Sequence, residues 1–554
     1  MTLSINFDKL HQELIFIPLG GSGEIGMNLN LYHYNGKWII VDLGIGFADP
    51  DLPGISIIVP DINFILQKIK KNILGIILTH AHEDHIGAIQ YLWPEIECPI
   101  YATKFTSLIV MSKCKEYRLA DKIQLIEIKS HQSFNLEDFT ITFIPITHSI
   151  PEMHGLLIET IKGKIFHTGD WKFDNEPIVG AKVDYNTLKQ IGESGVLALI
   201  GDSTNIFLKE HSGSEGKLGK NLEKLLYQSN NLIIVTTFAS NIARLVSLTQ
   251  AAKKVGRKVI LQGRSLQKMY RAAKESGYFK ESIIIDEKYI KNFEANEILI
   301  ICTGCQGENL AVMTKIINKK HPYISLKQDD LVIFSSKIIP GNEKKIYSLF
   351  NKLAEMKVNV LSENNEFVHV SGHPSRLEVE KMFQLIKPKI AIPVHGEAIH
   401  LNEHCKVAKE LGITETFSVR NGDVIIINDT DSRKIGKVEA GYNMIDGNLI
   451  LHEKNQIIED RKVLRDSGVI FISLVVNQKR KDIKKIHILT PGLLEVTLDN
   501  DILRTIKNNI LKMCKTLPLL DENSTKKRIQ SFIKKYIKKT LNKSPLIQCI
   551  ISII

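Results

Sequence analysis

The segment LTHAHEDHIG at residues 78–87 constrains the fold more than any other, because it places four metal-ligating side chains between a buried strand and a helix. In an extended loop, side chains two residues apart point the same way, so His80 and His82 can hold one metal ion. Asp84 and His85 then fall on the other side of the loop, where they can hold a second ion. Imidazole and carboxylate ligands suit Zn²⁺, or Mn²⁺ in its place. The segment therefore predicts two neighbouring divalent metal sites.

Four side chains cannot complete two metal sites, so further ligands are expected elsewhere in the chain. His148 follows the apolar segment FTITFIPI, Asp170 follows KIFHTG, and His395 follows KIAIPV. Each lies at the C-terminal end of an expected strand, where loops commonly carry functional side chains. An aspartate between two cations can offer one carboxylate oxygen to each, which makes Asp170 the expected bridge.

Hydrophobic periodicity divides the chain into strand-rich and alternating parts. Short buried strands are expected at residues 36–43, 73–79 and 139–146. Beyond residue 214 helices and strands alternate, in the order helix 219–228, strand LIIVTTF, helix 243–255 and strand KVILQG. Such alternation is typical of an α/β unit with a mostly parallel sheet. A second strand-rich stretch follows Ile435.

Length and composition restrict the class of protein. A chain of 554 residues is too long for one core, so roughly two to four domains are expected. No apolar run reaches the roughly 18 residues that span a bilayer, and the N-terminal segment lacks the features of a signal peptide. Seven scattered cysteines favour a reducing cytoplasm over a disulfide framework. We therefore expect a cytoplasmic protein without membrane association, and the net charge of +11 indicates a polyanionic partner.

The metal-ligand motifs resemble the metallo-β-lactamase superfamily, whose first motif is matched by Asp42 in VDLG. Three further segments resemble the β-CASP branch of that superfamily, which acts on nucleic acids. They are GDSTN with Asp202, SGHPS with His373 and PVHGE with His395. Within this branch, PLGGSGEIGMN, TFASN, TGCQGEN and HVSGH are similar to the ribonuclease J family, and the resemblance runs from about residue 14 to the end.

The resemblance implies an α/β fold in which a metallo-β-lactamase αββα sandwich carries an inserted α/β β-CASP domain and a small C-terminal α+β domain. The sandwich is expected at residues 1–214, the β-CASP domain at 215–348 and the C-terminal domain at 455–554. A returning segment of the sandwich, at 349–440, would deliver His373 and His395.

The resemblance also implies a metal-dependent ribonuclease that hydrolyses RNA phosphodiesters in messenger RNA turnover and ribosomal RNA maturation, as a 5′-to-3′ exonuclease and an endonuclease. Two divalent ions would activate a water, which leaves a 5′-phosphate and a 3′-hydroxyl. His373 is the expected stabiliser of the phosphoryl transition state. Asp84 and Asp170 are expected to be catalytic as ligands of the metal ions. Asp42 and Asp202 are expected to contact the metal ligands and not the metal ions.

Substrate binding is expected on the segment HVSGH and on TFASN. A nuclease that works from an end needs a pocket for the terminal phosphate, and backbone amides and small hydroxyls suit it. The predicted residues are His369, Val370, Ser371, Gly372, His373, Ser240 and Asn241. Two departures from the family, Ala243 in place of histidine and Cys305 in place of serine, lie outside the predicted metal ligands.

Several alternatives stay open on the sequence alone. The chemistry needs no 2′-hydroxyl, so DNA is an alternative substrate. A small thioester or lactam would be another, although the phosphate-side motifs argue against it. A catalytically silent RNA-binding scaffold belongs to a different class, and all seven predicted ligands argue against that.

The C-terminal part is expected to assemble subunits. Residues 523–554 hold eight Lys/Arg and no Asp or Glu, which fits either RNA contact or a solvated helix face. An expected helix there places its apolar residues on one face, and PLIQCIISII reads as an apolar strand. The apolar residues of the helix are Ile529, Phe532, Ile533, Ile537 and Leu541. The resemblance implies a homodimer or higher oligomer, with RNA-decay or ribosome-associated proteins as further partners.

Overall fold

The computed structural model describes residues 5–280, 283–477, 482–495, 499–516 and 522–553. The chain forms two compact units. Unit 1 comprises Met1–Gly46 and Val59–Gly441, and unit 2 comprises Phe47–Ile58 and Tyr442–Ile554. The last residue of the expected C-terminal strand, Ile554, lies outside the described residues, and the expected domain boundaries stay predictions.

Unit 1 contains two sheets that enclose a common core. The eight-stranded sheet has the order β25 (Arg433–Lys437), β24 (Asp423–Ile427), β1 (Leu14–Gly20), β3 (Leu29–Tyr34), β4 (Lys37–Val41), β7 (Ile73–Ile77), β8 (Ile100–Ala102), β9 (Leu125–Glu127). The seven-stranded sheet has the order β10 (Ser133–Leu136), β11 (Phe139–Pro145), β12 (His154–Thr160), β13 (Gly163–His167), β14 (Ala198–Asp202), β21 (Ile390–Val394), β23 (Glu415–Thr416). Phe16 and Ile39 from the first sheet pack with Phe143 and Ile392 from the second.

Helices cover the outer faces of this sandwich. A second cluster of buried residues, including Leu188, Met382 and Val407, packs under three helices on the seven-stranded sheet. They are α4 (Tyr185–Glu193), α10 (Arg376–Ile386) and α11 (Ala398–Glu410). On the other sheet, α2 (Ile89–Ile96) contacts α3 (Lys104–Glu116), which contacts β9. The αββα arrangement confirms the predicted fold class, and the three strands expected near its site are β4, β7 and β11.

A third sheet of unit 1 is inserted between two neighbouring strands of the second. Its six parallel strands run in the order β17 (Ile284–Ile285), β16 (Lys258–Gln262), β18 (Ile298–Cys302), β15 (Ile233–Thr236), β19 (Leu331–Phe334), β20 (Asn359–Leu361). The chain leaves the sandwich after β14 and returns to β21, which pairs with β14 in parallel. This confirms the predicted insertion of an α/β domain with a parallel sheet.

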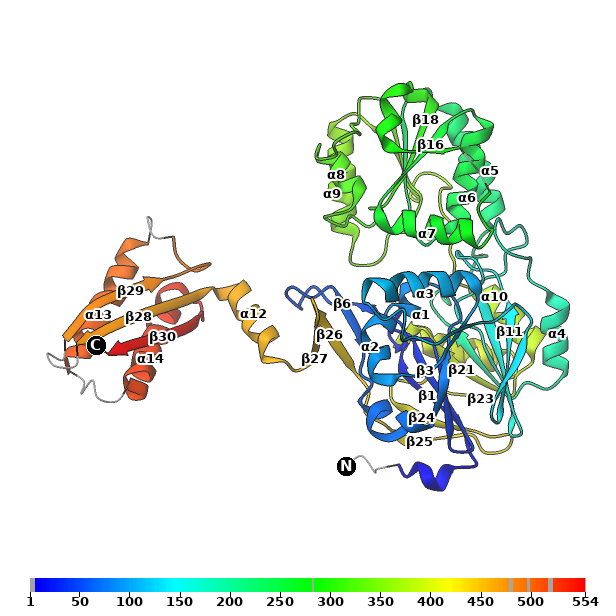
Figure 1. Ribbon diagram of the computed structural model, residues 1–554, viewed down its shortest axis with the longest axis horizontal. Helices are drawn as coiled ribbons and strands as arrows, with labels where there is room; N and C mark the ends of the chain where they lie inside the picture. The colour runs from blue at the N-terminus through cyan, green and yellow to red at the C-terminus, as the bar shows by residue number, and fades with distance from the viewer. Residues whose placement is uncertain (1–4, 281–282, 478–481, 496–498, 517–521, 554) are drawn as a thin grey trace. The chain divides into compact units, whose positions relative to one another are not determined.

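Helices lie on both sides of the inserted sheet (Figure 1). They are α5 (Glu215–Gln228), α6 (Ile242–Lys254), α7 (Arg264–Glu275), α8 (Val312–Ile317) and α9 (Glu343–Glu355). The prediction began the first helix at Gly219, four residues too late. Ser214 caps it by accepting a hydrogen bond from the Gly216 amide, so the cap overrides the weak helix propensity of the two glycines.

Unit 2 ends in an α+β sandwich. From Tyr442 on, its elements are β26 (Tyr442–Asp446), β27 (Leu449–His452), α12 (Gln456–Ser467), β28 (Val469–Asn477), β29 (Asp482–Leu489), α13 (Asn500–Thr516), α14 (Glu522–Leu541) and β30 (Leu546–Ile553). The sheet order is β29-β28-β30, with α13 and α14 packed on one face (Figure 1). Ile529, Ile533 and Ile537 of α14 are buried in this core, as the predicted apolar face requires. Among the described residues, no helix is long and apolar enough to cross a membrane.

Candidate metal centre

The predicted ligands meet at one edge of the seven-stranded sheet. Strands β11 and β13 are each antiparallel to β12, and β13, β14 and β21 pair in parallel. All four therefore run the same way and end at the same edge. The loops that follow β11, β13 and β21 carry His148, Asp170 and His395, and Asp202 is the last residue of β14.

The ligand loop after β7 differs from its predicted extended form. His80 and His82 precede α1 (Glu83–Ile86), a single helical turn that carries Asp84 and His85. The carbonyl of His82 accepts hydrogen bonds from the amides of His85 and Ile86, which closes the turn. The four side chains nevertheless divide into two groups, His80 with His82 and Asp84 with His85.

Three histidines form the first group. His82 Nδ1 lies 3.0 Å from His80 Nε2 and 3.0 Å from His148 Nε2. His148 Nδ1 is held 2.6 Å from the Gly372 carbonyl and His80 Nδ1 lies 3.0 Å from Thr79 Oγ1. Because each Nδ1 hydrogen donates to oxygen, the Nε2 lone pairs of His80 and His148 point at the same place. Converging lone pairs repel one another unless a cation lies between them, so this donor set fits a metal ion.

The first group is also uncharged. Burial, reinforced by the neighbouring histidines, lowers the pKa of His80 and His148 well below the usual value. Burial likewise lowers the pKa of His82 to about 4, against the opposing effect of Asp84 and Asp170. Neutral imidazole is the form that ligates metals.

The second group combines two carboxylates with two histidines. His395 Nε2 lies 3.0 Å from Asp84 Oδ2, and His85 Nε2 lies 3.1 Å from Asp170 Oδ2. The same Asp170 oxygen lies 4.0 Å from His80 Nε2 in the first group. Asp170 is thus common to both groups, each of which gathers its ligand atoms within 4.8 Å.

Charge is concentrated in this second group. Burial favours the neutral acids, yet His85 and His395 hold the pKa of Asp84 and of Asp170 well below the usual range. Conversely, burial favours neutral imidazole, but the carboxylates led by Asp170 raise the pKa of His85 and His395 well above the ordinary value. The ionised carboxylates therefore favour positive charge at this position, which a divalent cation supplies.

Asp202 and His373 lie beside the second group. His373 Nδ1 lies 2.8 Å from Asp202 Oδ2 and 3.8 Å from Asp170 Oδ2, and its ring stacks on that of His395 at 5.4 Å. Burial lowers the pKa of His373, but Asp202 and Asp170 outweigh burial and raise it. Together with Asp170 and His395 they form a third set of possible ligands. The sequence predicted two sets only, and neither Asp202 nor His373 was among the predicted ligands.

Side chains behind the ligands orient them. Asp42 accepts hydrogen bonds from the Thr79 amide at 2.8 Å and from His85 Nδ1 at 2.7 Å. Thr204 Oγ1 lies 2.7 Å from His395 Nδ1. Asp42 and His395 both have positive φ, a strained conformation that functional sites often retain. Thr79 and Thr204 were not among the predicted site residues, although they lie inside the motifs THAHEDH and GDSTN.

The predicted substrate residues fall into two classes. Val370 is buried, and Asn241 caps α6 by accepting from the Arg244 amide at 2.9 Å, so both side chains are already engaged. Ser240 is half-buried on the loop before α6. Gly372 approaches His148 so closely that an added Cβ would lie 2.7 Å from the ring.

The segment 369–373 holds the more available groups. Ser371 Oγ accepts from Asn205 Nδ2 at 2.6 Å and from the His373 amide at 3.2 Å. His369 Nδ1 is buried without a hydrogen-bond partner among the described residues. Burial lowers the pKa of His369, and the cations Arg244, Lys172 and Lys337 lower it further. This is a cationic, donor-rich environment. Ala243 and Cys305, the two residues that differ from the family pattern, are both buried.

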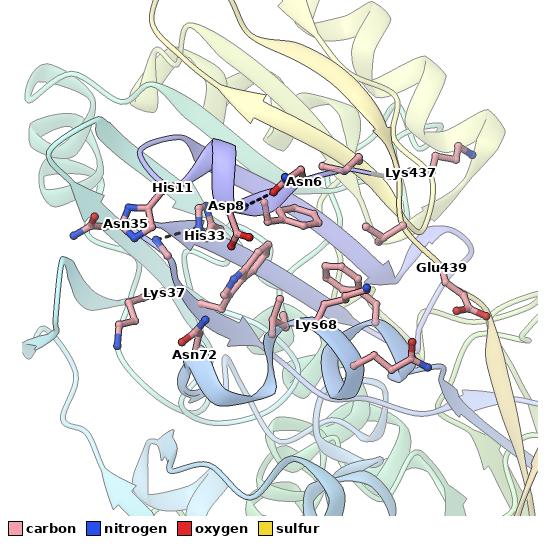
Figure 2. Close-up of a pocket in the computed structure, with 18 residues that line it drawn as sticks. Asn6, Asp8, His11, His33, Asn35, Lys37, Lys68, Asn72, Lys437 and Glu439 are labelled. Atoms are coloured by element: carbon pink, nitrogen blue, oxygen red, sulfur yellow. Dashed lines mark hydrogen bonds between the residues drawn. The ribbon is translucent and has the colours of Figure 1, made fainter. Parts of the chain in front are cut away.

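A separate cavity of about 710 Å³ lies elsewhere in unit 1 (Figure 2). Trp38 and Phe64 line it, together with His33. The His33 ring contacts the Glu13 carbonyl at 3.0 Å and the Gly36 amide at 3.2 Å, so both of its nitrogens are satisfied. None of the predicted site residues lines this cavity, and cavity size therefore does not locate the chemistry.

The two facing sheets, the inserted parallel sheet and the His/Asp cluster define a metallo-β-lactamase hydrolase of the β-CASP class. Four sequence families match. They are described as a beta-lactamase superfamily domain at residues 37–185, the ribonuclease J beta-CASP domain at 230–353, a Zn-dependent metallo-hydrolase RNA specificity domain at 357–418, and the ribonuclease J C-terminal domain at 456–554. Divalent metal use follows from these matches and the cluster.

Relatives extend the match over nearly the whole chain. Ribonuclease J of Sinorhizobium meliloti is 34% identical over 96% of this chain and 95% of its own length. Ribonuclease J 1 of Streptococcus pyogenes is 36% identical over 90% of each chain, and ribonuclease J2 of Bacillus subtilis 33% over 88% of each. The chain belongs to the ribonuclease J family. A solved structure of a protein of unknown function from Enterococcus faecalis V583 shares the fold, with a TM-score of 0.52 and 16% identity over 75% of this chain and all of that one.

Proposed function

We propose that this chain is a metal-dependent ribonuclease that hydrolyses RNA phosphodiesters as a 5′-to-3′ exonuclease and an endonuclease, in messenger RNA turnover and ribosomal RNA maturation. The observation that carries the proposal is the cluster of seven histidines and aspartates in two groups that share Asp170. A silent RNA-binding scaffold has no need of such a cluster. RNA rather than DNA is proposed because the relatives are named ribonucleases.

Two divalent ions, Zn²⁺ or Mn²⁺, are assigned to the cluster. His80, His82 and His148 would hold the first ion and Asp84, His85 and His395 the second, with Asp170 as the bridge. The nitrogen-rich first group suits zinc, and the carboxylates of the second also suit manganese. When bound, the ions polarise phosphate oxygens and bring the pKa of a water near neutrality.

The chain's own residues position the reaction. Thr79, Asp42 and Gly372 fix the rings of the histidine ligands through the contacts given above. His373, whose pKa Asp202 and Asp170 raise against the effect of burial, donates a hydrogen bond to the negative charge that develops on the phosphoryl oxygens. The water oxygen forms a bond to phosphorus as the bond to the 3′ oxygen breaks. The water loses one proton to the solvent and the departing 3′ oxygen takes one up, so the protons balance. The products are a 5′-phosphate and a 3′-hydroxyl.

A pocket for a 5′-monophosphate is proposed on the segment 369–373. His369, Ser371 and the Gly372 amide offer donors beside His373, and the cations around His369 favour an anion. Because the Val370 side chain is buried, only its backbone can contact the substrate. Ser240 and Asn241 would contact the substrate through their backbone groups or through Ser240 Oγ. A triphosphate brings extra bulk and charge that a pocket of this kind rejects.

One digestion tests the activity and its polarity. A single-stranded RNA labelled at either end, with a 5′-monophosphate, triphosphate or hydroxyl, is incubated with the metal-replete protein beside DNA of the same sequence. We expect mononucleotides to appear first from the 5′ end of the monophosphorylated RNA, with internal cuts on all RNAs. Release from the 3′ end contradicts the polarity, equal cleavage of the DNA contradicts the substrate, and no cleavage with two bound ions contradicts the function.

Assembly is proposed through the open face of the unit 2 sheet. The helices cover one face, and the other exposes Phe471 by 43%, Leu489 by 63% and Ile550 by 59%. Phe471 pairs with Leu489, and Ile550 lies on the neighbouring strand β30. A second copy of the chain would cover this apolar patch in a homodimer or higher oligomer.

The seven free cysteines support a cytoplasmic location, where RNA-decay or ribosome-associated proteins are proposed as further partners.

A further inference from the structure

The positive charge of the chain is concentrated in its C-terminal part. Residues 442–554 hold 21 Lys/Arg and 11 Asp/Glu, whereas residues 1–441 hold 51 and 50. The C-terminal part therefore carries +10 of the net charge of +11. The metal centre lies in the part that is almost neutral overall, so nearly all of the excess positive charge that attracts a polyanion over a distance lies in the C-terminal part.

The cations of α14 gather on its exposed side. Lys527, Lys534 and Lys538 recur at intervals of seven and four residues, which places them along one stripe of a helix. Arg528, Lys535 and Lys539 form the adjacent stripe with the same intervals. All six side chains are exposed. We call these six residues the cationic face.

The cationic face has no internal counter-charge. Among the described residues none of its six members forms an ion pair, and the single acidic residue of α14, Glu522, pairs with Lys526. By contrast, Lys406 on α11 lies near both Glu403 and Glu410. Like charges four residues apart destabilise a helix, so a merely solvated helix favours alternating signs. The uncompensated stripes indicate that a ligand supplies the negative charge.

The rest of α14 argues for a phosphate backbone rather than a bilayer. Its apolar residues are buried in the core of unit 2 or packed against that core, so they are not free to enter a membrane. A shallow concavity at the N-terminal end of the cationic face, which includes two of its six residues, is lined by residues with hydrogen-bond donors. They are Asn523, Ser524, Lys527, Arg528 and Ser531. Cations with small polar donors are the groups that contact phosphates in nucleic-acid complexes.

We propose that the cationic face of α14 binds the phosphodiester backbone of single-stranded RNA without reading its bases. The inference rests on the proposed function, because it makes RNA the substrate that this surface retains. A strand held there is attached to the chain that carries the active site, so the second contact of the same strand becomes intramolecular. The surface therefore lowers KM for long RNA and leaves the chemical step unchanged.

The test replaces four lysines of the face by glutamine, as K534Q, K535Q, K538Q and K539Q in the full-length, metal-replete protein. A matched control changes four exposed lysines of unit 1, as K115Q, K122Q, K320Q and K344Q. For a 30-nucleotide RNA we expect KM to rise about tenfold in the first variant only, with kcat within about twofold. The slope of log affinity against log salt should fall in magnitude by up to about 3, because each lost phosphate contact removes about 0.7.

Further arms separate the possible causes. A five-nucleotide RNA should be cleaved by both variants as by the parent, and four lysine-to-arginine changes at the same positions should restore the parental KM. An unchanged KM and salt slope, or a loss equal to that of the control, overturns the inference. Loss of binding to anionic phospholipid vesicles or to polyglutamate, with RNA binding intact, assigns the face to another partner. Binding is also measured directly in the Asp170→Asn background, so a failure of RNA hydrolysis remains distinguishable from a failure of this surface.

Discussion

Residues 1–441 and residues 442–554 differ in where their charged side chains lie and in their net charge. In the first part, the carboxylates of the metal centre are buried (Asp170) or half-buried (Asp84) and each faces a histidine, and the overall charge is close to zero. In the second part, the cations of α14 are exposed and face solvent. Among the described residues of 442–554, no group of His, Cys, Asp and Glu could hold a metal ion.

The difference separates catalysis from affinity. A metal centre needs fixed distances, which only burial and surrounding hydrogen bonds provide. Attraction of a polyanion needs only exposed charge and is weakened by salt. Changes in residues 1–441 should therefore act on kcat or end preference, and changes in residues 442–554 on assembly or KM.

The largest effect is expected at Asp170, which belongs to all three groups of possible ligands. Asp170→Asn should abolish RNA hydrolysis while the fold is retained, because the bridge between the groups loses its charge. Circular dichroism checks the fold, elemental analysis counts the ions, and Asp121→Asn, an exposed aspartate of the same unit, is the control. Near-parental turnover of the metal-replete variant would defeat the two-metal assignment, and His80→Ala should behave in the same way.

His373→Ala should have the next largest effect, lowering kcat by about 10²–10³ with both ions retained, as the loss of a transition-state donor does. The readout is kcat together with the metal content of the purified variant. If one ion is lost, His373 is a ligand through the group that it forms with Asp202, and its proposed role is wrong.

A smaller effect is expected at the proposed phosphate pocket. His369→Ala should reduce the preference for a 5′-monophosphate over a 5′-hydroxyl by about tenfold, the value of one hydrogen bond to a charged group. Internal cleavage should be unchanged. His400→Ala is the matched control, because its Nδ1 likewise has no partner among the described residues. An unaltered preference would remove His369 from the pocket.

The smallest effect on the chemistry is expected in unit 2. Phe471→Glu should convert the oligomer to monomers and leave kcat per active site within about twofold, because a charge on the open sheet face disfavours burial. Light scattering measures the mass, with Tyr347→Glu in unit 1 as an exposed aromatic control. Truncation near residue 455 should also give monomers, with weaker activity. An oligomer that persists in both variants would contradict assembly through this part of the chain.

Local patterns predicted much of the fold. The alternation of helices and strands predicted the inserted parallel sheet, and the apolar periodicity predicted the buried side of α14. Both predictions succeeded because period and propensity are properties of neighbouring residues. The start of α5 was misplaced because a single capping serine outweighed two glycines.

By itself, the sequence determined which side chains could ligate metals and that they follow strands. Only the tertiary structure decided which of them share an ion pair or a hydrogen bond. Asp202 meets His395 because β14 and β21 pair with Asp202 beside Val394. It meets His373 because the segments that follow the two residues form a bridge between Asn205 and Ser375. Likewise, only the structure shows that Asn241 caps a helix and that His369 Nδ1 has no hydrogen-bond partner among the described residues. Such distances depend on strand register and on the packing of distant segments, which no local pattern encodes.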